Sequence, residues 1–470
     1  MNLKSICYYL GFFCFPISFL AFINILYSSY FDYFLSIDSY IATLFVSLLI
    51  GFSFYFFGRK GGKKINYIEQ LILIFLTYLV VGFLISIPYY FSNFKVSFLS
   101  AYFEAISGIT GTGFSIFKNI KYLDPTLILW RSSSQWIGGL YFLIFLSIFF
   151  SNKLFNFKMT QLTYSNENSF NLEKKIYNQI LQIFIFYCVL SIIFFILLSF
   201  SGIRLFNSLN LSMTFVSGGG FLPSDNLSNI ISSNFQELIS AFLILLSLLN
   251  FYLVFNIFNK RVLSKNHNED LYLVLISVIL ILIAFVNDID SFNLIFAVLS
   301  SLANSGLTYI ETETNLTLYF LLITVIGGSL ISNTSGIKLA RFYILLKVTS
   351  SEIIKLISPN SIVNKTIFSS EKKITDENIK ISFLIFISFF LSLFILSSLL
   401  VIDDIGFERS FKVSILTLTN TVNSEMYGLQ KLNFANLLTS SKISLIIFMI
   451  IGKIELISVF LIFKNFFIRY

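Results

Sequence analysis

The sequence predicts an all-α polytopic membrane protein, and three features of the chain lead to this prediction. Hydrophobic residues make up 56% of the 470 positions and charged residues only 12%, which is more apolar surface than one water-soluble core could bury. The apolar residues form runs that approach the roughly 20 residues needed for a membrane-spanning helix. Shorter segments of small and polar residues lie between these runs and recur four times.

About ten apolar segments approach the length of a span. In chain order they are residues 6–27, 41–57, 68–90, 127–150, 180–200, 238–258, 271–286, 316–346, 381–402 and 443–467. The first run is too long for a signal-peptide core and has no Ala-x-Ala cleavage site, so we expect it to be retained. The first two spans form an N-terminal extension, residues 1–62.

Basic residues in the loops orient these spans. They cluster after the second, fourth and sixth spans: Arg59, Lys60, Lys63, Lys64, Lys153, Lys158, Lys174, Lys175, Lys260, Arg261 and Lys265. Because short loops rich in Lys and Arg stay in the cytoplasm, these loops and both termini are predicted to be cytoplasmic. The net charge of +8 therefore reflects topology, and no nucleic-acid partner is expected.

Residues typical of metal and catalytic sites are scarce. His267 is the single histidine, and Cys7, Cys14 and Cys188 lie in apolar runs without the spacing of metal ligands. This composition excludes zinc chemistry and a histidine-based catalytic triad. No bound cofactor is expected.

Four loops on the opposite side contain a half-length apolar stretch followed by small residues: residues 98–115, 205–221, 292–308 and 411–423. A dozen helical residues rise only about 18 Å, so each stretch is expected to enter the membrane and leave on the same face. Non-helical backbone at this depth must be buried in protein or line water. The four units, residues 63–160, 170–262, 268–350 and 376–470, are therefore predicted to share one aqueous pathway.

Glycines follow the first half-length stretch, between Ser107 and Ser115. Glycine permits backbone angles that point successive carbonyls toward one axis, where they can replace the water shell of a cation. Alone, this segment also fits an ordinary turn, but similar segments recur in the other units. The candidate cation-binding residues are Thr110, Gly111, Thr112, Gly113, Val216, Ser217, Gly218, Gly219, Asn304, Ser305, Gly306, Asn420, Thr421 and Val422.

With these segments and four further motifs, the chain resembles the Trk/Ktr/HKT superfamily and, within it, the TrkH-like potassium transporters. The motifs are Phe103-Glu-Ala with Ser107-Gly108, residues 130–139 (WRSSSQWIGG), Gly327-Gly-Ser with Gly336-Ile-Lys338, and Gly452-Lys-Ile-Glu455. The resemblance covers nearly the whole chain and implies potassium as the transported ion, four units around a central pore, and a filter glycine from each. Matched residue by residue, these glycines are Gly113, Gly219 and Gly306, and Val422 stands at the fourth position.

Val422 departs from the glycine that the resemblance predicts. A β-branched residue resists positive φ, so we expect this quarter of the filter to be distorted and the preference for potassium over sodium to be weaker. The alternative is that a local backbone shift accommodates the valine. A sodium-permeable or proton-coupled member of the same superfamily is therefore an alternative function.

The eighth predicted span contains a run of small and polar residues that could break the helix: Gly327, Gly328, Ser332, Asn333, Thr334, Ser335 and Gly336. A close helix contact is the simple alternative, whereas the resemblance implies a loop that obstructs the pore beneath the filter. Lys453, where relatives usually have arginine, is expected to form an electrostatic barrier or an ion pair. Glu104 is expected to anchor its half-helix, and Arg131, Ser132 and Gln135 to have structural roles.

The resemblance also implies a homodimer in a bacterial inner membrane and a cytoplasmic nucleotide-binding regulatory subunit of the TrkA type. The chain has no GxGxxG or GxxxxGK(S/T) motif of its own. Its basic segments 153–175 and 347–373 are candidate docking surfaces, and lipid is the remaining partner. A membrane enzyme acting on lipid-linked substrates, with Asp403 and Asp404 as candidate acids, is an alternative from another class.

Overall fold

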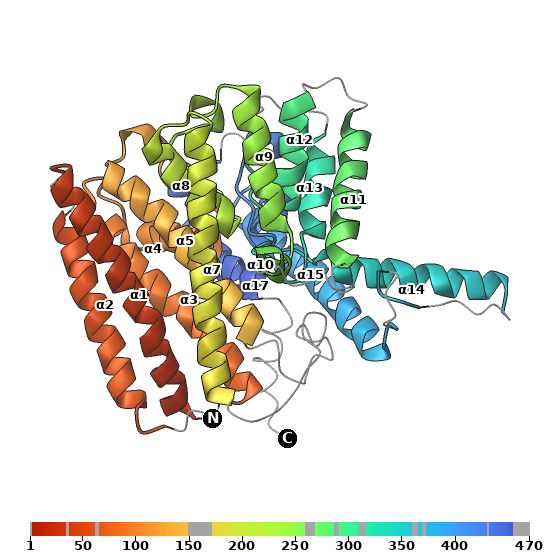
Figure 1. The fold of residues 1–470 in the computed structure, drawn as a ribbon, viewed down its shortest axis with the longest axis horizontal. Coiled ribbons are helices and arrows are strands. Elements are labelled where there is room, and N and C mark those ends of the chain that lie inside the picture. The colour runs from red at the N-terminus through yellow and green to blue at the C-terminus, as the bar shows by residue number, and fades with distance from the viewer. Residues whose placement is uncertain are drawn as a thin grey trace.

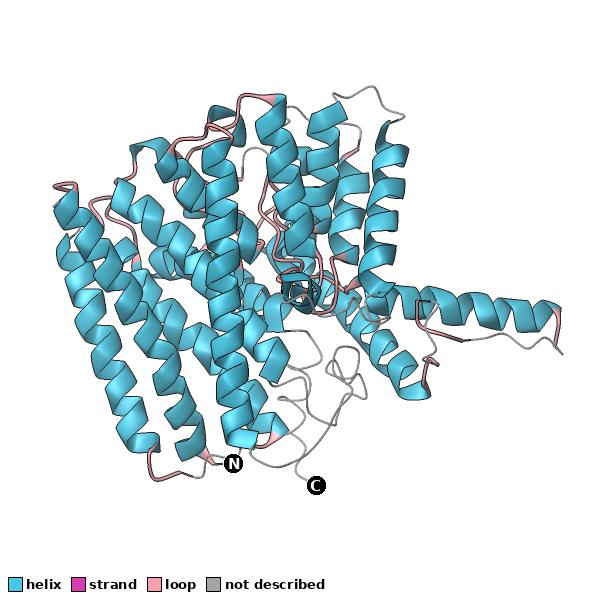
Figure 2. Cartoon of the chain, viewed as in Figure 1, coloured by secondary structure: helices cyan, strands magenta, loops and turns pink. Residues whose placement is uncertain are grey.

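The computed structural model describes residues 2–33, 37–61, 65–148, 172–258, 268–285, 291–309, 316–359, 365–368, 373–429 and 432–454. In these ranges the regular structure consists of helices, apart from one isolated bridge between Thr366 and Lys373 (Figure 2). The α-helices are α1 (Leu3–Tyr30), α2 (Ile37–Gly58), α3 (Tyr67–Tyr90), α4 (Phe98–Thr110), α5 (Pro125–Ile148), α7 (Leu172–Phe200), α8 (Leu205–Ser217), α9 (Asn234–Leu248), α10 (Phe251–Phe258), α11 (Asn268–Ala284), α12 (Ser291–Leu302), α13 (Thr317–Ile326), α14 (Leu339–Ile357), α15 (Asp376–Ile402), α16 (Phe407–Leu418) and α17 (Thr439–Ile454).

The predicted fold class is confirmed. Among the described residues, α1, α2, α3, α7 and α15 are by themselves long and apolar enough to cross a membrane. The half-length helices α4, α8, α12 and α16, of 12 or 13 residues, occupy the four loops where they were predicted. The chain is therefore a multi-pass membrane protein that contains both full-length and half-length helices.

Helices α1 and α2 lie side by side at one edge of the bundle (Figure 1). Glycines allow their backbones to approach: a Cβ built on Gly58 would lie 2.2 Å from the backbone N of Tyr8. Small residues at such crossings are typical of helix packing in lipid. The Tyr141 hydroxyl on α5 donates to the carbonyl of Phe13 at 2.7 Å, which ties this pair of helices to the rest of the bundle.

Two of the predicted spans are broken. The interruption predicted in residues 316–346 is present, because α13 ends at Ile326 and α14 begins at Leu339. The uninterrupted span predicted for residues 238–258 is wrong, since α9 ends at Leu248 and α10 begins at Phe251. Here Asn250 N–H donates to Asp270 Oδ1 and Phe251 N–H donates to the Ile331 carbonyl, both at 2.8 Å. These bonds satisfy backbone groups that a break in lipid would otherwise leave unpaired.

Helix α14 runs across the direction of the long helices and extends away from the body of the protein (Figure 1). Its outer half is exposed, including the large apolar side chains of Ile353, Leu356 and Ile357. Three predicted spans reach positions that lie outside the described residues: 149–150, 286 and 455–467.

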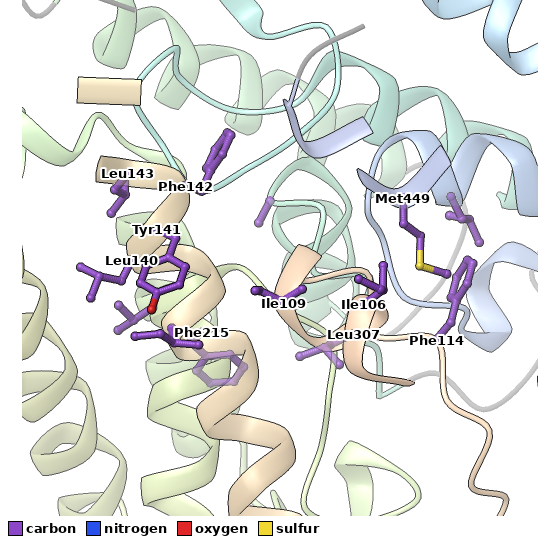
Figure 3. Packing of buried hydrophobic residues seen from close by; sticks show 14 of the residues in the cluster. Ile106, Ile109, Phe114, Leu140, Tyr141, Phe142, Leu143, Phe215, Leu307 and Met449 are labelled. Carbon is purple, nitrogen blue, oxygen red and sulfur yellow. The ribbon is translucent and has the colours of Figure 1, made fainter. Parts of the chain in front are cut away.

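Apolar side chains fill the space around the half-helices (Figure 3). Ile106 and Ile109 of α4 are fully buried, as are Phe114 behind them and Met449 of α17. The ring of Phe114 stacks on that of Phe434 with 4.5 Å between centroids. This packing fixes the C-terminal ends of the half-helices, where the candidate site begins.

Candidate ion pathway

Each half-helix is followed, within two residues, by a residue with left-handed backbone geometry. These residues are Gly111 (φ 80°), Gly218 (φ 65°), Asn304 (φ 59°) and Asn420 (φ 50°). Glycine adopts this conformation without steric cost, and asparagine tolerates it better than most residues. The four loops therefore begin with the same kind of turn. We call each half-helix together with the loop that follows it a hairpin, and we number the hairpins one to four in chain order.

A hydroxyl tether relates the hairpins to one another. Ser107 Oγ donates to the carbonyl seven residues later, that of Phe114, at 2.7 Å. Thr214 and Ser300 make the same bond, seven residues on, to Phe221 at 2.8 Å and Leu307 at 2.7 Å. The residue before each tethered carbonyl is Gly113, Gly220 or Gly306. In hairpin four, Leu416 stands where the other hairpins have the hydroxyl residue, and Val422 stands where they have the glycine.

This alignment places Gly220, and not the predicted Gly219, at the position of hairpin two that is equivalent to Gly113. Backbone bonds support it: Gly219 N–H donates to the carbonyl five residues before it, as Ser305 and Thr421 do. A Cβ on Gly219 would lie 2.3 Å from Gln135 Oε1, so Gly219 faces α5, the helix that carries Gln135. The Gly-Phe pair in both Gly113-Phe114 and Gly220-Phe221 is the signal that gives the correct match.

The four equivalent positions converge on one small space. A Cβ built on Gly113 would lie 2.9 Å from Cα of Gly220 and 3.0 Å from Cγ2 of Val422. One built on Gly306 would lie 2.8 Å from the Val422 carbonyl oxygen. Gly113 and Gly306 have positive φ, whereas neither Gly220 nor Val422 does. The expected strain at Val422 is therefore absent, because its position, like that of Gly220, uses ordinary backbone angles.

A buried ion pair supports hairpin one from behind. Arg131 Nε donates to Glu104 Oε1 at 2.9 Å, and both side chains are almost completely buried. Glu104 also accepts from the Ile116 N–H at 2.8 Å and from Ser115 Oγ at 3.0 Å. The predicted anchoring role of Glu104 is confirmed, and Arg131 has the predicted structural role.

The same supporting helix, α5, also reaches hairpin two. Arg131 donates to the Leu222 carbonyl at 3.4 Å and lies 4.1 Å from the ring centroid of Phe221. Gln135 Oε1 accepts from the Phe221 N–H at 3.1 Å. We call Glu104, Arg131 and Gln135 the filter scaffold, because they join two hairpins through buried polar contacts.

The segment between α13 and α14, residues 327–338, lies directly against the hairpins, and we call it the membrane loop. Asn333 Nδ2 donates to the Val216 carbonyl at 2.7 Å in hairpin two. Ser335 N–H donates to Asn304 Oδ1 at 3.1 Å, and Ser335 Oγ to Asn420 Oδ1 at 3.0 Å. The loop is thus bonded to three of the four hairpins through neutral groups.

Two buried lysines accompany the membrane loop. Lys338 donates to Ser332 and Thr334, with 2.9 Å to Thr334 Oγ1, so the loop is wrapped around its ammonium group. Lys453 Nζ donates to the Asn333 carbonyl at 2.9 Å and lies 4.5 Å from the ring centroid of Phe142. A Cβ on Gly111 would lie 3.8 Å from Lys453 Nζ, which places a positive charge next to the filter residues. Glu455 lies outside the described residues.

Two further residues that the sequence analysis did not select are Glu269 and Asp270, in the first turn of α11. Glu269 Oε1 accepts from the Leu330 N–H of the membrane loop at 2.9 Å. Asp270 accepts from Asn250, and the neighbouring Phe251 N–H bonds the loop at Ile331. First-turn acids are ordinary at a helix N-terminus, so nothing in the sequence alone distinguishes this pair.

The remaining candidate residues lie between these contacts. Thr112 Oγ1 is 2.8 Å from Thr110 Oγ1 and accepts from Asn420 Nδ2 at 2.9 Å. Within the membrane loop, Gly328 N–H donates to Thr334 Oγ1 at 3.1 Å, and Gly327 and Gly336 have positive φ. The structure therefore brings the candidate filter residues and the membrane loop into one contiguous site.

Solved structures contain the same architecture. The chain superposes on the crystal structure of the potassium transporter TrkH from Vibrio parahaemolyticus with a TM-score of 0.87, covering 100% of both chains at 20% sequence identity. It has the TrkH fold. No protein-family model matches the chain.

Sequence comparisons agree with the TrkH fold. The chain is 25% identical over 429 residues to the "Uncharacterized cation transporter MJ1485" of Methanocaldococcus jannaschii, covering 87% of this chain and 84% of that protein. It is 24% identical over 457 residues to the Trk system potassium uptake protein TrkG of Escherichia coli, covering 92% of each. It is 24% identical over 449 residues to TrkH of Salmonella typhimurium, covering 91% of each. The TrkH-like resemblance predicted from the motifs is confirmed.

Proposed function

We propose that this chain is the translocation subunit of a Trk-type potassium uptake system. The observation that carries the proposal is the convergence of four half-helix ends on the space between Gly113, Gly220, Gly306 and Val422. Carbonyls grouped around such a space replace the water shell of a cation. Potassium as the ion is supported by the named Trk relatives, which are similar over nine-tenths of the chain.

The half-helices add an electrostatic attraction for cations. Helices α4, α8, α12 and α16 all end at the converging loops, and the C-terminal end of a helix carries a partial negative charge. Entry of a monovalent cation into a negative cell interior is favoured by the membrane potential. No covalent chemistry is needed for this function.

The membrane loop and Lys453 form the gate of the proposed pathway. Asn333 and Ser335 bond filter residues directly, and the Lys453 ammonium lies close to Gly111. An ion leaving the filter on this side meets a polar loop and a positive charge. Deleting the loop residues between Gly327 and Gly336 is expected to raise ion flux, and unchanged flux would count against a gate.

Rubidium uptake into proteoliposomes tests the proposed function. The purified chain is reconstituted, a potential is imposed, and uptake is competed with potassium, sodium or caesium. Block by potassium and not by sodium is the expected result. Absence of uptake, even with a nucleotide-binding regulatory partner supplied, would overturn the assignment.

A sodium-permeable or proton-coupled transporter is the second candidate, and Val422 is the observation that favours it. Only three of the four equivalent filter positions are glycine. Equal block of rubidium uptake by sodium and potassium supports this candidate. The Val422→Gly variant would then be expected to recover a preference for potassium.

We further propose a homodimer in a bacterial inner membrane, with both termini in the cytoplasm. Helix α14 supports the dimer, because its exposed apolar residues need a covering surface. For a TrkA-type regulatory subunit, segment 347–373 is the candidate docking surface. Two of its lysines, Lys355 and Lys365, lie 3.7 and 2.7 Å from Glu352. Segment 153–175 lies outside the residues for which side chains are described.

The chain is proposed to have no enzymatic activity. Asp403, one of the acids that the enzyme alternative requires, accepts hydrogen bonds from Ser440 Oγ at 2.7 Å and Ser441 Oγ at 2.5 Å. These bonds join the end of α15 to the start of α17, which is a structural task. The relatives similar to the chain are named as transporters and uptake proteins.

A further inference from the structure

The side chain of Val422 lies in the space that the three filter glycines leave open. A Cβ on Gly113 would lie 3.0 Å from Cγ2 of Val422, and one on Gly306 would lie 3.1 Å from Cγ1. One built on Gly220 would lie 2.4 Å from the Val422 Cβ. These glycines come from three different hairpins. The isopropyl group, which is partly buried, therefore lies against the backbone of three hairpins.

An isopropyl group at this level opposes the passage of a cation. A filter conducts because oxygen atoms replace the ion's hydration shell, and hydrophobic constrictions close pores by excluding water. Val422 offers no side-chain oxygen, and its two methyl groups face the backbones that would line the ion's path. An ion here would lose ligands on one side without replacement, which costs free energy.

Neighbouring contacts hold Val422 in this position. The Thr421 N–H donates to the Leu416 carbonyl at 2.8 Å, and Thr421 Oγ1 lies 2.9 Å from Thr419 Oγ1. Asn304 Nδ2 of hairpin three donates to the same Thr421 oxygen at 3.3 Å. A β-branched side chain has few accessible χ1 rotamers. Ion passage therefore requires a rotamer change or a shift of the hairpin-four backbone.

We infer that Val422 is a hydrophobic constriction in the filter that limits the rate of cation flux. This inference rests on the proposed transport function and adds a barrier to it. The constriction is separate from the membrane loop, which contacts hairpin four at Asn420, two residues earlier. The chain thus has two barriers in series, one apolar and one polar.

A substitution series at Val422 tests the constriction by initial rubidium uptake, normalised to folded protein from size-exclusion chromatography. Val422→Ala and Val422→Gly remove methyl groups and are expected to raise uptake by about tenfold, whereas Val422→Ile lowers it. The matched control is Val401→Ala on the surface of α15, where the valine is 39% exposed. Its uptake should equal that of the parent chain.

A second readout is independent of the gate. Potassium that binds the filter raises the melting temperature of the purified protein, and Val422→Gly should lower the potassium concentration for half of that rise. A conducting parent chain whose Gly variant changes neither uptake nor this concentration would overturn the constriction. If parent and variants all fail to conduct, the transport function is wrong, and the melting series still decides whether Val422 opposes ion binding.

Discussion

Two buried cations flank the candidate pathway, and their partners differ. Arg131 is paired with the Glu104 carboxylate at 2.9 Å. Lys453 donates to a neutral carbonyl, that of Asn333, at 2.9 Å. A buried charge with a counter-ion is fixed in place, while one held by neutral groups keeps an uncompensated field around it. From this difference we expect Arg131 to be a permanent support and Lys453 to act on the ion.

The filter scaffold around Arg131 and the membrane loop beside Lys453 also differ in the kind of hydrogen bond that holds them. In the filter scaffold, Glu104 and Arg131 form a charged pair, which is the stronger kind of bond, and Gln135 adds a neutral one. The membrane loop is bonded to the hairpins by neutral amide and hydroxyl groups, each contributing about 0.5–1.5 kcal/mol. Substitutions in the scaffold should therefore change stability, and substitutions around the loop should change flux.

The largest effect is expected for Glu104→Gln. The glutamine has the same shape but leaves the Arg131 guanidinium without a counter-ion in a site that is 1% exposed, which costs about 3–5 kcal/mol. Thermal unfolding in detergent measures the loss. The control is Glu408→Gln, which breaks the pair between the exposed Glu408 and Lys412 and should leave the unfolding temperature close to that of the parent chain. Equal losses for both variants would contradict a scaffold role.

Lys453→Met should act on flux. The variant keeps the length of the side chain and removes the ammonium group beside Gly111, so rubidium uptake is expected to rise about tenfold. The control is Lys442→Met on the same helix, where the lysine donates to Ser100 Oγ and the Ala435 carbonyl at 2.8 Å. Its uptake per folded protein should stay at the parent level. A fall in uptake for Lys453→Met would show that the lysine supports conduction.

The two adjacent glycines of hairpin two sharpen the comparison further. The methyl group added by Gly219→Ala would clash with the Gln135 side chain of the scaffold. The methyl group added by Gly220→Ala would clash with the Val422 side chain. Overpacking costs about 1–3 kcal/mol in either case, but only Gly220→Ala should reduce rubidium uptake per folded protein. Val422→Gly in the same chain should restore that uptake. If Gly219→Ala is the variant that blocks uptake, the alignment of the hairpins is wrong.

The smallest effect is expected for Glu269→Gln. The amide oxygen still accepts from the Leu330 N–H, but the carboxyl group is replaced by an amide, which changes the bond by no more than about 1 kcal/mol. The membrane loop is then held less firmly, and uptake should rise by a small factor, measured in the same assay. Glu377→Gln in the first turn of α15 is the control, because its side chain is exposed. An equal rise in rubidium uptake for Glu377→Gln would contradict the expectation that Glu269 holds the membrane loop.

The sequence predicted the fold well because its signals are local. The length of an apolar run gives a span, and a half-length run before small residues gives a hairpin. The break at Asn250 could not be predicted, because the groups that satisfy it, Asp270 and the Ile331 carbonyl, are distant in the chain. Residues 238–258 are mostly apolar, and their few polar residues, Asn250 among them, also occur within unbroken helices, so composition alone does not locate the break.

The candidate site was predicted less completely, for two physical reasons. In Gly218-Gly219-Gly220 the three residues are identical, so the match to Gly113 depends on the phenylalanine that follows, and the hydroxyl tether from Thr214 supports that match. Val422 was expected to strain a positive φ, yet its φ is not positive, and the proposed consequence of its side chain is steric. The backbone angle at Val422 cannot be read from residue types alone.

The tether that Leu416 cannot make has a mechanical consequence. Hairpins one, two and three each brace the carbonyl after the filter position with a hydroxyl from their own half-helix. Hairpin four has an aliphatic side chain at that point and lacks this hydrogen bond. The loop segment after Val422 is therefore expected to be less rigid than its three counterparts. Thermal displacement of the hairpin backbone should concentrate there, beside Val422.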